Sequence, residues 1–143
     1  MLELVLQDAH MCFGCSLANP IGLKLKFSFE GDICRATFLP EARHQGWNGY
    51  MHGGLISTLL DEAMGQWLWL NKINCMTAEM TTRFKRGVAI GEQLTVEAWC
   101  EGHRGKIYEL SAQLLLSDGT VAAKAGARFL RVNVKTQERL EGL

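Results

Sequence analysis

The sequence predicts an α+β fold in which one long, buried helix is wrapped by a curved antiparallel sheet of five to six strands. One stretch in the middle of the chain, from His52 to near Leu70 or Asn71, carries apolar residues at helical spacing. From Met76 onward the spacing changes to the alternation of half-buried strands, and glycine-containing turns divide that region. At 143 residues and 48% hydrophobic composition, the chain is long enough for one domain with its own core.

Two short strands are expected before the helix, at residues 24–29 and 33–38. The turn between them contains Gly31, which tolerates the backbone angles of a tight hairpin. Pro40 ends this unit. A loop rich in glycine and aromatic residues, residues 45–50, then leads to the helix.

The helix is apolar on almost every side. Its regular stripe is extended by Trp69 and Leu70, which leave only a thin polar face. The stripe consists of Leu55, Ile56, Leu59, Leu60, Ala63, Met64, Trp67 and Leu68. Such a helix must be covered by the rest of the fold.

Four strands are expected after the helix. Residues 77–84 form the first, and alternation of apolar and polar residues marks the others at 94–100, 110–116 and 121–129. The turns between them are expected at Gly87 with Gly91, at Gly102 with Gly105, and at residues 117–119. One face of each long strand is apolar, as in an antiparallel sheet.

The charge balance excludes several classes of protein. Fifteen Lys and Arg residues against 15 Asp and Glu residues give a net charge of zero, so neither nucleic acid nor an anionic membrane is the expected partner. No apolar run reaches the roughly 20 residues of a membrane-spanning helix. Residues 1–10 lack the basic start of a signal peptide. Five cysteines, an odd number, then predict reduced thiols in a cytoplasmic protein.

Asp61 is the unusual residue of the helix. An ionised carboxylate among apolar neighbours costs several kcal/mol of desolvation unless another group compensates it, and such carboxylates often serve as catalytic bases. A structural interpretation is also open, in which Asp61 lies on the thin polar face with Glu62 and Gln66.

His52, Gly53 and Gly54 stand where the helix begins. The first backbone N–H groups of a helix are unpaired donors at the positive end of its dipole, and such donors suit the oxyanion of an acyl-transfer intermediate. Asp61 follows His52 by nine residues, which is roughly 13 Å along a helix. One reacting carbonyl cannot contact both within one chain, so the spacing favours a site shared between two chains.

Residues 49–65, with the sequence GYMHGGLISTLLDEAMG, resemble the signature of hotdog-fold acyl-CoA thioesterases of the phenylacetate-pathway (PaaI-like) type. That family carries G-x-x-H-G-G with an acid nine residues after the histidine. The resemblance extends through residues 77–84, Gly91-Glu92, Asp118-Gly119 and Ala122-Ala123, and so covers most of residues 22–129. The earlier segments Cys-Phe-Gly-Cys at 12–15 and Asn-Pro-x-Gly-Leu at 19–23 are common in one branch of these proteins.

The resemblance implies a role for each matching residue. Asp61 corresponds to the carboxylate that attacks the thioester carbonyl or activates water, and the N–H of Gly54 or Gly53 to the group that polarises the carbonyl. His52 is similar to a histidine that positions the thioester. Thr77 stands where some relatives place a Ser or Thr that holds the water from the neighbouring subunit. The family's site lies at a dimer interface, so a homodimer is expected, and a tetramer of two dimers.

The resemblance and the charges also suggest how coenzyme A is bound. Gly46 stands where some relatives use Asn or Gln to contact the thioester, so Gln45, Asn48 or backbone alone is left for that role. Phosphate groups of coenzyme A require cations at the mouth of an apolar site. The candidate cations are Arg83, Lys85, Arg86, Arg104 and Lys106. The alternative is that these residues line an ordinary solvated strand edge.

Cys12 and Cys15 do not predict a metal site. A zinc site needs two further ligands, and neither His10, Cys34 nor His103 stands at a matching spacing. The strand-to-helix context of a redox motif is missing as well. The expected organisation is a single domain over residues 1–143, with an N-terminal cap at 1–22 and a core at 23–132.

The expected function is hydrolysis of an acyl-CoA thioester by Asp61. No cofactor is expected, since coenzyme A is part of the substrate, and no metal. Two alternatives stay open: a hotdog hydratase or dehydratase acting on enoyl or hydroxyacyl thioesters, and a protein that binds acyl-CoA without catalysis. The acyl group is not specified, because a tunnel would depend on how Trp47, Tyr50, Met64 and Trp67 pack.

Overall fold

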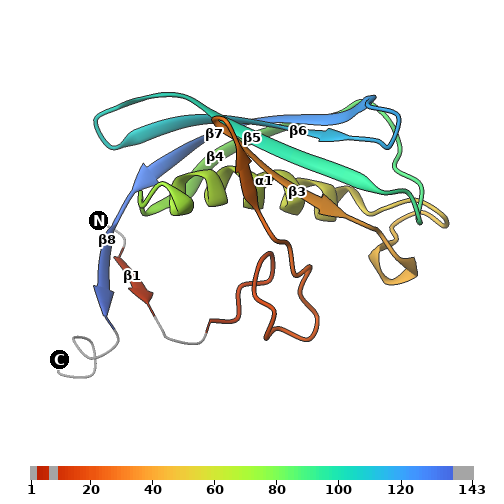
Figure 1. Cartoon of the computed structure of the whole chain (residues 1–143), viewed down its shortest axis with the longest axis horizontal. Coiled ribbons are helices and arrows are strands. Elements are labelled where there is room, and N and C mark those ends of the chain that lie inside the picture. The colour runs from red at the N-terminus through yellow and green to blue at the C-terminus, as the bar shows by residue number, and fades with distance from the viewer. Residues whose placement is uncertain (1–2, 7–9, 137–143) are drawn as a thin grey trace.

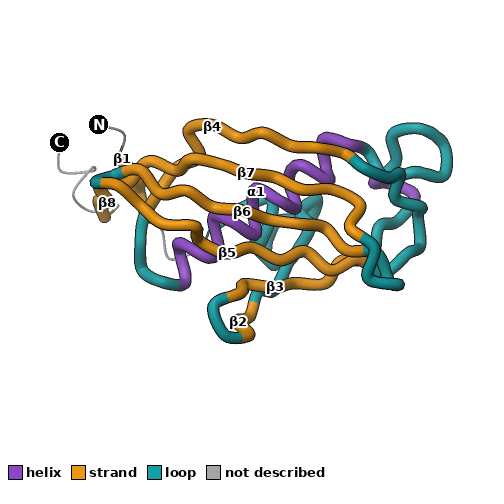
Figure 2. The backbone as a smooth tube through the Cα atoms, turned by 90° about the horizontal axis from the view of Figure 1, so that it is seen from above, coloured by secondary structure: helices purple, strands orange, loops and turns teal. Residues whose placement is uncertain are grey.

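A computed structural model describes residues 3–6 and 10–136 of the chain and confirms the predicted fold class (Figure 1). Helix α1 (Gly53–Leu70) packs across one face of a six-stranded antiparallel sheet, whose strands lie in the order β2-β3-β5-β6-β7-β4. The strands are β2 (Ser28–Glu30), β3 (Ile33–Phe38), β4 (Cys75–Phe84), β5 (Leu94–Arg104), β6 (Ile107–Leu115) and β7 (Val121–Arg131). A 3₁₀ helix, η1 (Ala42–His44), precedes α1. Seen from above, α1 crosses beneath the strands obliquely (Figure 2).

A second, two-stranded sheet was not predicted. It pairs β1 (Glu3–Leu6) with β8 (Asn133–Thr136) in parallel, outside the main sheet (Figure 1). Each strand has four residues, and the two come from opposite ends of the chain. Neither has a local turn or a long alternation to reveal it, because the pairing is made entirely by distant segments.

The first predicted strand is shorter than expected. Of residues 24–29, only the last two belong to β2. Lys24 adopts a left-handed backbone conformation with φ of 55°, which interrupts an extended strand. The N–H groups of Leu23 and Leu25 donate to the carbonyls of Phe13 and Gly14 instead of to a sheet neighbour. The segment therefore pairs with the N-terminal loop.

The turn predicted at Gly102 and Gly105 is confirmed at Gly105 but is wrong for Gly102. Strand β5 continues through Gly102 to Arg104, and the chain turns at Gly105. Gly102, with φ of 146°, follows a bulge where the pairing of β5 with β6 shifts after Cys100. A glycine inside a strand thus marks an irregularity of pairing and not the end of the strand.

Helix α1 provides the centre of the core. The residues of the helix with the least exposure are Ile56, Leu59, Leu60, Ala63, Met64 and Leu68. Trp67 is half-buried, and its Nε1–H donates to the carbonyl of Asp32 in the β2–β3 turn at 2.8 Å. Trp69 and Leu70, which were expected to be covered, are 47% and 45% exposed. No helix within residues 3–6 and 10–136 has the length and apolarity needed to cross a membrane.

Strand β4 lies at one edge of the sheet and contains a bulge. Thr77 pairs with Phe129 of β7, but Glu79 pairs with the next residue, Arg128, so Ala78 is left without a partner. Because side chains alternate along a strand, one extra residue reverses the faces. Thr77 consequently faces the helix, as its pairing with the buried Phe129 requires.

His44 makes the stability of the fold depend on pH. Its side chain is buried against Phe38, and its Nδ1 accepts a hydrogen bond from the Glu41 N–H at 2.9 Å. Burial lowers the pKa of His44 below its ordinary value of 6.5; the charge of Arg43 adds to this effect, and that of Glu41 opposes it.

Between the lowered folded pKa and the ordinary value, the unfolded chain binds the proton more readily than the folded chain. The free energy of unfolding should therefore fall as the pH is lowered through about 6.5. Urea unfolding at a series of pH values measures the slope, which should flatten in His44→Gln and persist in His103→Gln, whose side chain is exposed. An equal slope in all three proteins would assign the effect to other groups.

Candidate functional site

The start of α1 is closed by the side chain of His52. His52 is the N-cap residue, and its Nδ1 accepts the Gly54 N–H at 2.9 Å. Its carbonyl accepts the N–H groups of Leu55 and Ile56. A Cβ at Gly54 would lie 3.0 Å from the His52 ring, so glycine allows the ring to close over this turn. Among the described residues, none accepts a hydrogen bond from the Gly53 N–H, which leaves one donor available to a ligand.

A cavity of about 500 Å³ opens beside this helix start. Gly53 and Phe84 line it together with Trp47 and Tyr50 of the preceding loop, whose side chains are 87% and 52% exposed. Lys85 and Arg86 contribute to the same lining. The cavity therefore combines apolar walls, one free backbone donor and two cations, which suits an uncharged group attached to an anionic carrier.

Asp61 lies in the middle of the helix and meets Thr77 across the bulged edge strand. The Thr77 hydroxyl donates to Oδ1 of Asp61 at 2.6 Å. Asp61 is half-buried, and its neighbours Glu62 and Gln66 are half-buried as well. Asp61 therefore lies on the thin polar face of the helix, with Glu62 and Gln66, and is not surrounded by apolar side chains alone. The contact fixes one carboxylate oxygen and leaves the other for chemistry.

One protomer does not bring the helix start and Asp61 together. Asp61 follows His52 by nine residues along one continuous helix, which is a rise of roughly 13 Å. Asp61 does not line the cavity beside Gly53. His52 is also engaged as a cap and is not paired with Asp61, as a proton-transfer couple would require.

Gln45 and Asn48, the two loop residues predicted to contact the thioester, differ in their surroundings. Gln45 is used inside the loop: its Nε2 donates to the Ala42 carbonyl at 2.9 Å, and its Oε1 accepts the Gly49 N–H at 2.6 Å. Asn48 is exposed. Gln45 therefore shapes the loop in this structure.

The candidate cations fall into two groups at opposite ends of the sheet. Arg83, Lys85 and Arg86 lie at the end of β4 beside the helix start, although only Lys85 and Arg86 line the cavity there. Arg104 and Lys106 lie at the β5–β6 turn. Strand β6 separates the two ends by eight residue steps, or roughly 27 Å. One protomer therefore does not place both groups around one phosphate.

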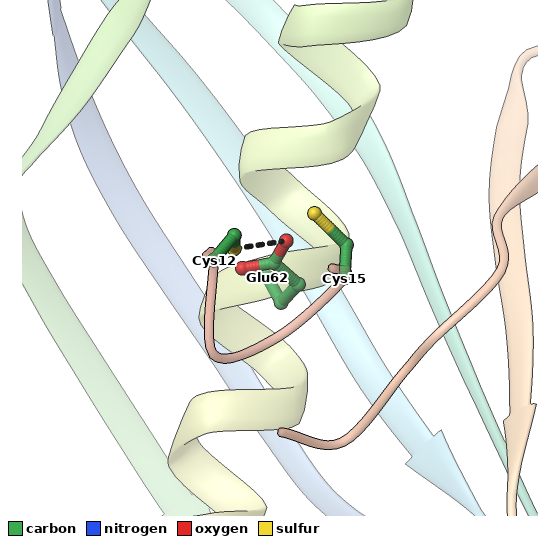
Figure 3. A group of neighbouring side chains, drawn as sticks. All are labelled: Cys12, Cys15 and Glu62. Carbon is green, nitrogen blue, oxygen red and sulfur yellow. Dashed lines mark hydrogen bonds between the residues drawn. The ribbon is translucent and has the colours of Figure 1, made fainter. Parts of the chain in front are cut away.

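The contact of Glu62 with the two cysteines was not predicted from the sequence. Its carboxylate lies against the thiols of Cys12 and Cys15 from the N-terminal loop (Figure 3). The available signal was the presence of Glu62 and Gln66 four residues apart on the polar face, since such residues share one side of a helix. Which distant segment covers that side could not be read from the sequence.

Comparison with known proteins identifies what this arrangement resembles. The model of a family described as the thioesterase superfamily matches residues 48–123. Comparison of the sequence with functionally curated proteins finds no match.

Solved structures share the fold at low sequence identity, and their hotdog architecture confirms the predicted one. A thioesterase superfamily protein has 24% identity and a TM-score of 0.78 over 82% of this chain, which spans only 61% of that protein. PaaI of E. coli, from the phenylacetic acid degradation operon, has 17% identity and a TM-score of 0.72 over 76% of this chain and 84% of its own.

A hypothetical thioesterase of Streptococcus pneumoniae, solved with coenzyme A, has 15% identity and a TM-score of 0.71 over 76% of this chain and 86% of its own. Two further structures of that protein, each with 14% identity and a TM-score of 0.72, carry alanine in place of one threonine or one aspartate. Each match covers 87% of this chain. It covers 98% of the threonine mutant's own chain and 99% of the aspartate mutant's.

The cap at the start of α1 can be tested by stability alone. Replacing His52 with Ala removes the side-chain acceptor of the Gly54 N–H and should lower the free energy of unfolding by about 1 kcal/mol. His52→Asn supplies an acceptor of similar reach and should recover most of this loss. Urea unfolding measures both variants, and equal losses in the two would contradict the capping role.

Proposed function

Because the chain belongs to the thioesterase superfamily, we propose that it hydrolyses an acyl-CoA thioester to a free acid and coenzyme A. The observation that carries this proposal is the Asp61–Thr77 pair. It lies on the same helix whose first turn offers a free N–H beside a cavity with two cations. Thioester hydrolysis uses all three elements: a carboxylate, an oxyanion donor and a binding site for the anionic carrier.

Asp61 acts on the thioester carbonyl in one of two ways. As a base it takes a proton from water, and the resulting hydroxide attacks the carbonyl carbon. As a nucleophile its own oxygen attacks, giving an anhydride that water then cleaves. In both routes the C–S bond breaks and coenzyme A leaves as the thiolate. The hydrogen bond from Thr77 orients the carboxylate in either case.

The Gly53 N–H is the preferred donor for the developing oxyanion. Gly54 was an equal candidate in the sequence, but its N–H is shared with His52. The Gly53 N–H lies at the positive end of the helix dipole and borders the cavity. A donor in this position stabilises the negative charge that forms on the carbonyl oxygen.

We propose that the complete site forms between two copies of the chain. The separation of roughly 12 Å along the helix prevents Gly53 and Asp61 of one copy from serving one carbonyl. Strand β4 supplies a ten-residue sheet edge on which a second copy can pair. Lys85 and Arg86 then contact the phosphates of the carrier, while Arg104 and Lys106 reach the carrier only from another subunit. A tetramer of two such dimers is the proposed assembly.

The Streptococcus pneumoniae thioesterase supports the choice of residues. Its two alanine mutants replace an aspartate and a threonine that stand 16 positions apart in that chain. Asp61 and Thr77 have the same separation here. This equal spacing, in a protein that has also been solved with coenzyme A, supports the choice of Asp61 and Thr77.

Substitution of the carboxylate should abolish most of the activity. Asp61→Asn is expected to lower kcat at least about 100-fold on a panel of acyl-CoA substrates assayed for released thiol, because loss of a catalytic base costs that much. Thr77→Val should reduce kcat less, through loss of orientation. Asp32→Asn, in an exposed turn, is the matched control. Cleavage by Asp61→Asn at the wild-type rate would refute the assignment.

A mixing experiment tests whether the site is shared. Gly53→Pro deletes the donor N–H, and the first helical position tolerates proline because His52 is already extended, with φ of −62° and ψ of 131°. Gly53→Pro and Asp61→Asn should each be nearly inactive alone. Mixed and re-equilibrated, they should regain about a quarter of wild-type activity, since half of the random dimers contain one intact shared site.

Gly53→Ala, which keeps the N–H, separates loss of the donor from the change of side chain. Light scattering on the same samples reports the size of the assembly, and co-purification of untagged Asp61→Asn with affinity-tagged Gly53→Pro reports the mixed dimers. Mixed dimers without any return of activity would show that each chain uses its own Gly53 and Asp61.

A further inference from the structure

The loop that carries Cys12 and Cys15 closes over Glu62 of helix α1. The two Sγ atoms and a carboxylate oxygen of Glu62 all lie within 4.8 Å of one another (Figure 3). The Cys12 thiol donates to Oε1 of Glu62 at 3.6 Å. All three residues are half-buried. The group lies outside the proposed thioester site and has no role in the proposed hydrolysis.

Backbone hydrogen bonds, one within the loop and one from Leu25, hold the loop in this shape. The Ser16 N–H donates to the Cys12 carbonyl at 3.0 Å, and the Leu25 N–H donates to the Gly14 carbonyl at 2.9 Å. A Cβ at Gly14 would stand 2.4 Å from Cδ of Glu62, so only glycine lets the turn approach the carboxylate this closely. The fold of the loop therefore holds both thiols next to the carboxylate without the help of a ligand.

The charges of this group are not balanced by a side chain. Within the described residues, Glu62 takes part in no salt bridge, and its partners are the Cys12 thiol and the Gln66 amide, at 3.2 Å. A divalent cation would favour the two thiolates and would compensate the charge of the carboxylate.

We propose that Cys12, Cys15 and Glu62 form a binding site for Zn²⁺. Ligand bonds of about 2.3 Å to sulfur and 2.0 Å to oxygen place the two atoms about 3.5 Å apart in a tetrahedral site. The observed separation of the Cys12 Sγ and Glu62 Oε1 is 3.6 Å. Binding releases one proton from each thiol, and both sulfurs bind as thiolates.

The fourth position faces Gln66 or solvent. The Gln66 Nε2 lies 3.4 Å from the Cys15 Sγ, so a half-turn of the amide brings its carbonyl oxygen to the same place. Either this oxygen or a water molecule completes the tetrahedron. The ion then fastens the N-terminal loop to α1 at the residue that follows Asp61, which is a structural role and does not depend on the proposed hydrolysis.

Titration of the full chain with Co²⁺ and Zn²⁺ in a phosphine reductant tests the site, because the reductant keeps both thiols free. One Co²⁺ per chain should bind, with a charge-transfer band of the intensity given by two thiolates and the visible bands of tetrahedral cobalt, and Zn²⁺ should displace it. Cys12→Ser and Cys15→Ser should lose the band. Glu62→Gln should weaken binding about tenfold or more. Cys75→Ser, which removes a half-buried thiol elsewhere, should bind as wild type does.

Several results would overturn the proposal. These are no stoichiometric binding by wild type, a cobalt spectrum without thiolate bands, or equal affinity in wild type and Glu62→Gln. If a cysteine variant does not fold, the wild-type spectrum and Glu62→Gln still decide the question. Zn²⁺ should also raise the unfolding temperature of wild type but not of Glu62→Gln at a matched low concentration. None of these readouts requires thioesterase activity, so failure of either proposal is distinguishable from failure of the other.

Discussion

The structure depends on covering a helix that is apolar on nearly every side. The sheet covers one face of α1, and each fully buried leucine there, such as Leu59 or Leu60, contributes about 2 kcal/mol. The β2–β3 turn, the sheet's edge strand β4 and the N-terminal loop contact other parts of the helix, and each supplies a polar partner to it, whereas Trp69 and Leu70 stay exposed. The β2–β3 turn accepts the indole N–H of Trp67, the edge strand donates to Asp61, and the N-terminal loop contacts Glu62. The polar groups with chemical potential thus lie where covering segments meet the helix.

Local patterns predicted the helix and most of the sheet. The apolar spacing of α1 and the alternation along β6 and β7 are properties of neighbouring residues, and the structure confirms them. Two errors concern segments whose partners lie far away in the chain: Leu23 and Leu25 donate hydrogen bonds to the N-terminal loop, and β1 pairs with β8. There tertiary pairing overrides the local preference. The third error concerns Gly102, which pairs with the nearby Glu109 across the β5–β6 hairpin and marks a bulge instead of a turn.

The candidate site shows the same division. Its residue types were recognisable from the chain, because the histidine, the two glycines and the acid stand at a fixed spacing. Their partners were not recognisable: that Gly54 shares its N–H with His52, and that Glu62 meets two thiols, follows from the three-dimensional contacts. The two groups of cations looked alike in the sequence, yet the length of β6 places them at opposite ends of the sheet. The length of the strand decides whether the two groups of cations can meet one phosphate, and the composition of the chain does not reveal that length.

The unpaired Ala78 in β4 lets two residues that stand two positions apart face opposite sides of the sheet. Thr77 lies opposite the buried Phe129 and contacts Asp61, whereas Glu79 lies opposite Arg128 on the other face. Deletion of Ala78 would make Thr77 and Glu79 neighbours and would leave both pairings in regular alternation. A strand that kept Ala78 and paired it regularly would instead turn the threonine away from the helix. The contact with Asp61 therefore depends on where the pairing with β7 shifts by one residue, and not on the identity of Ala78 itself.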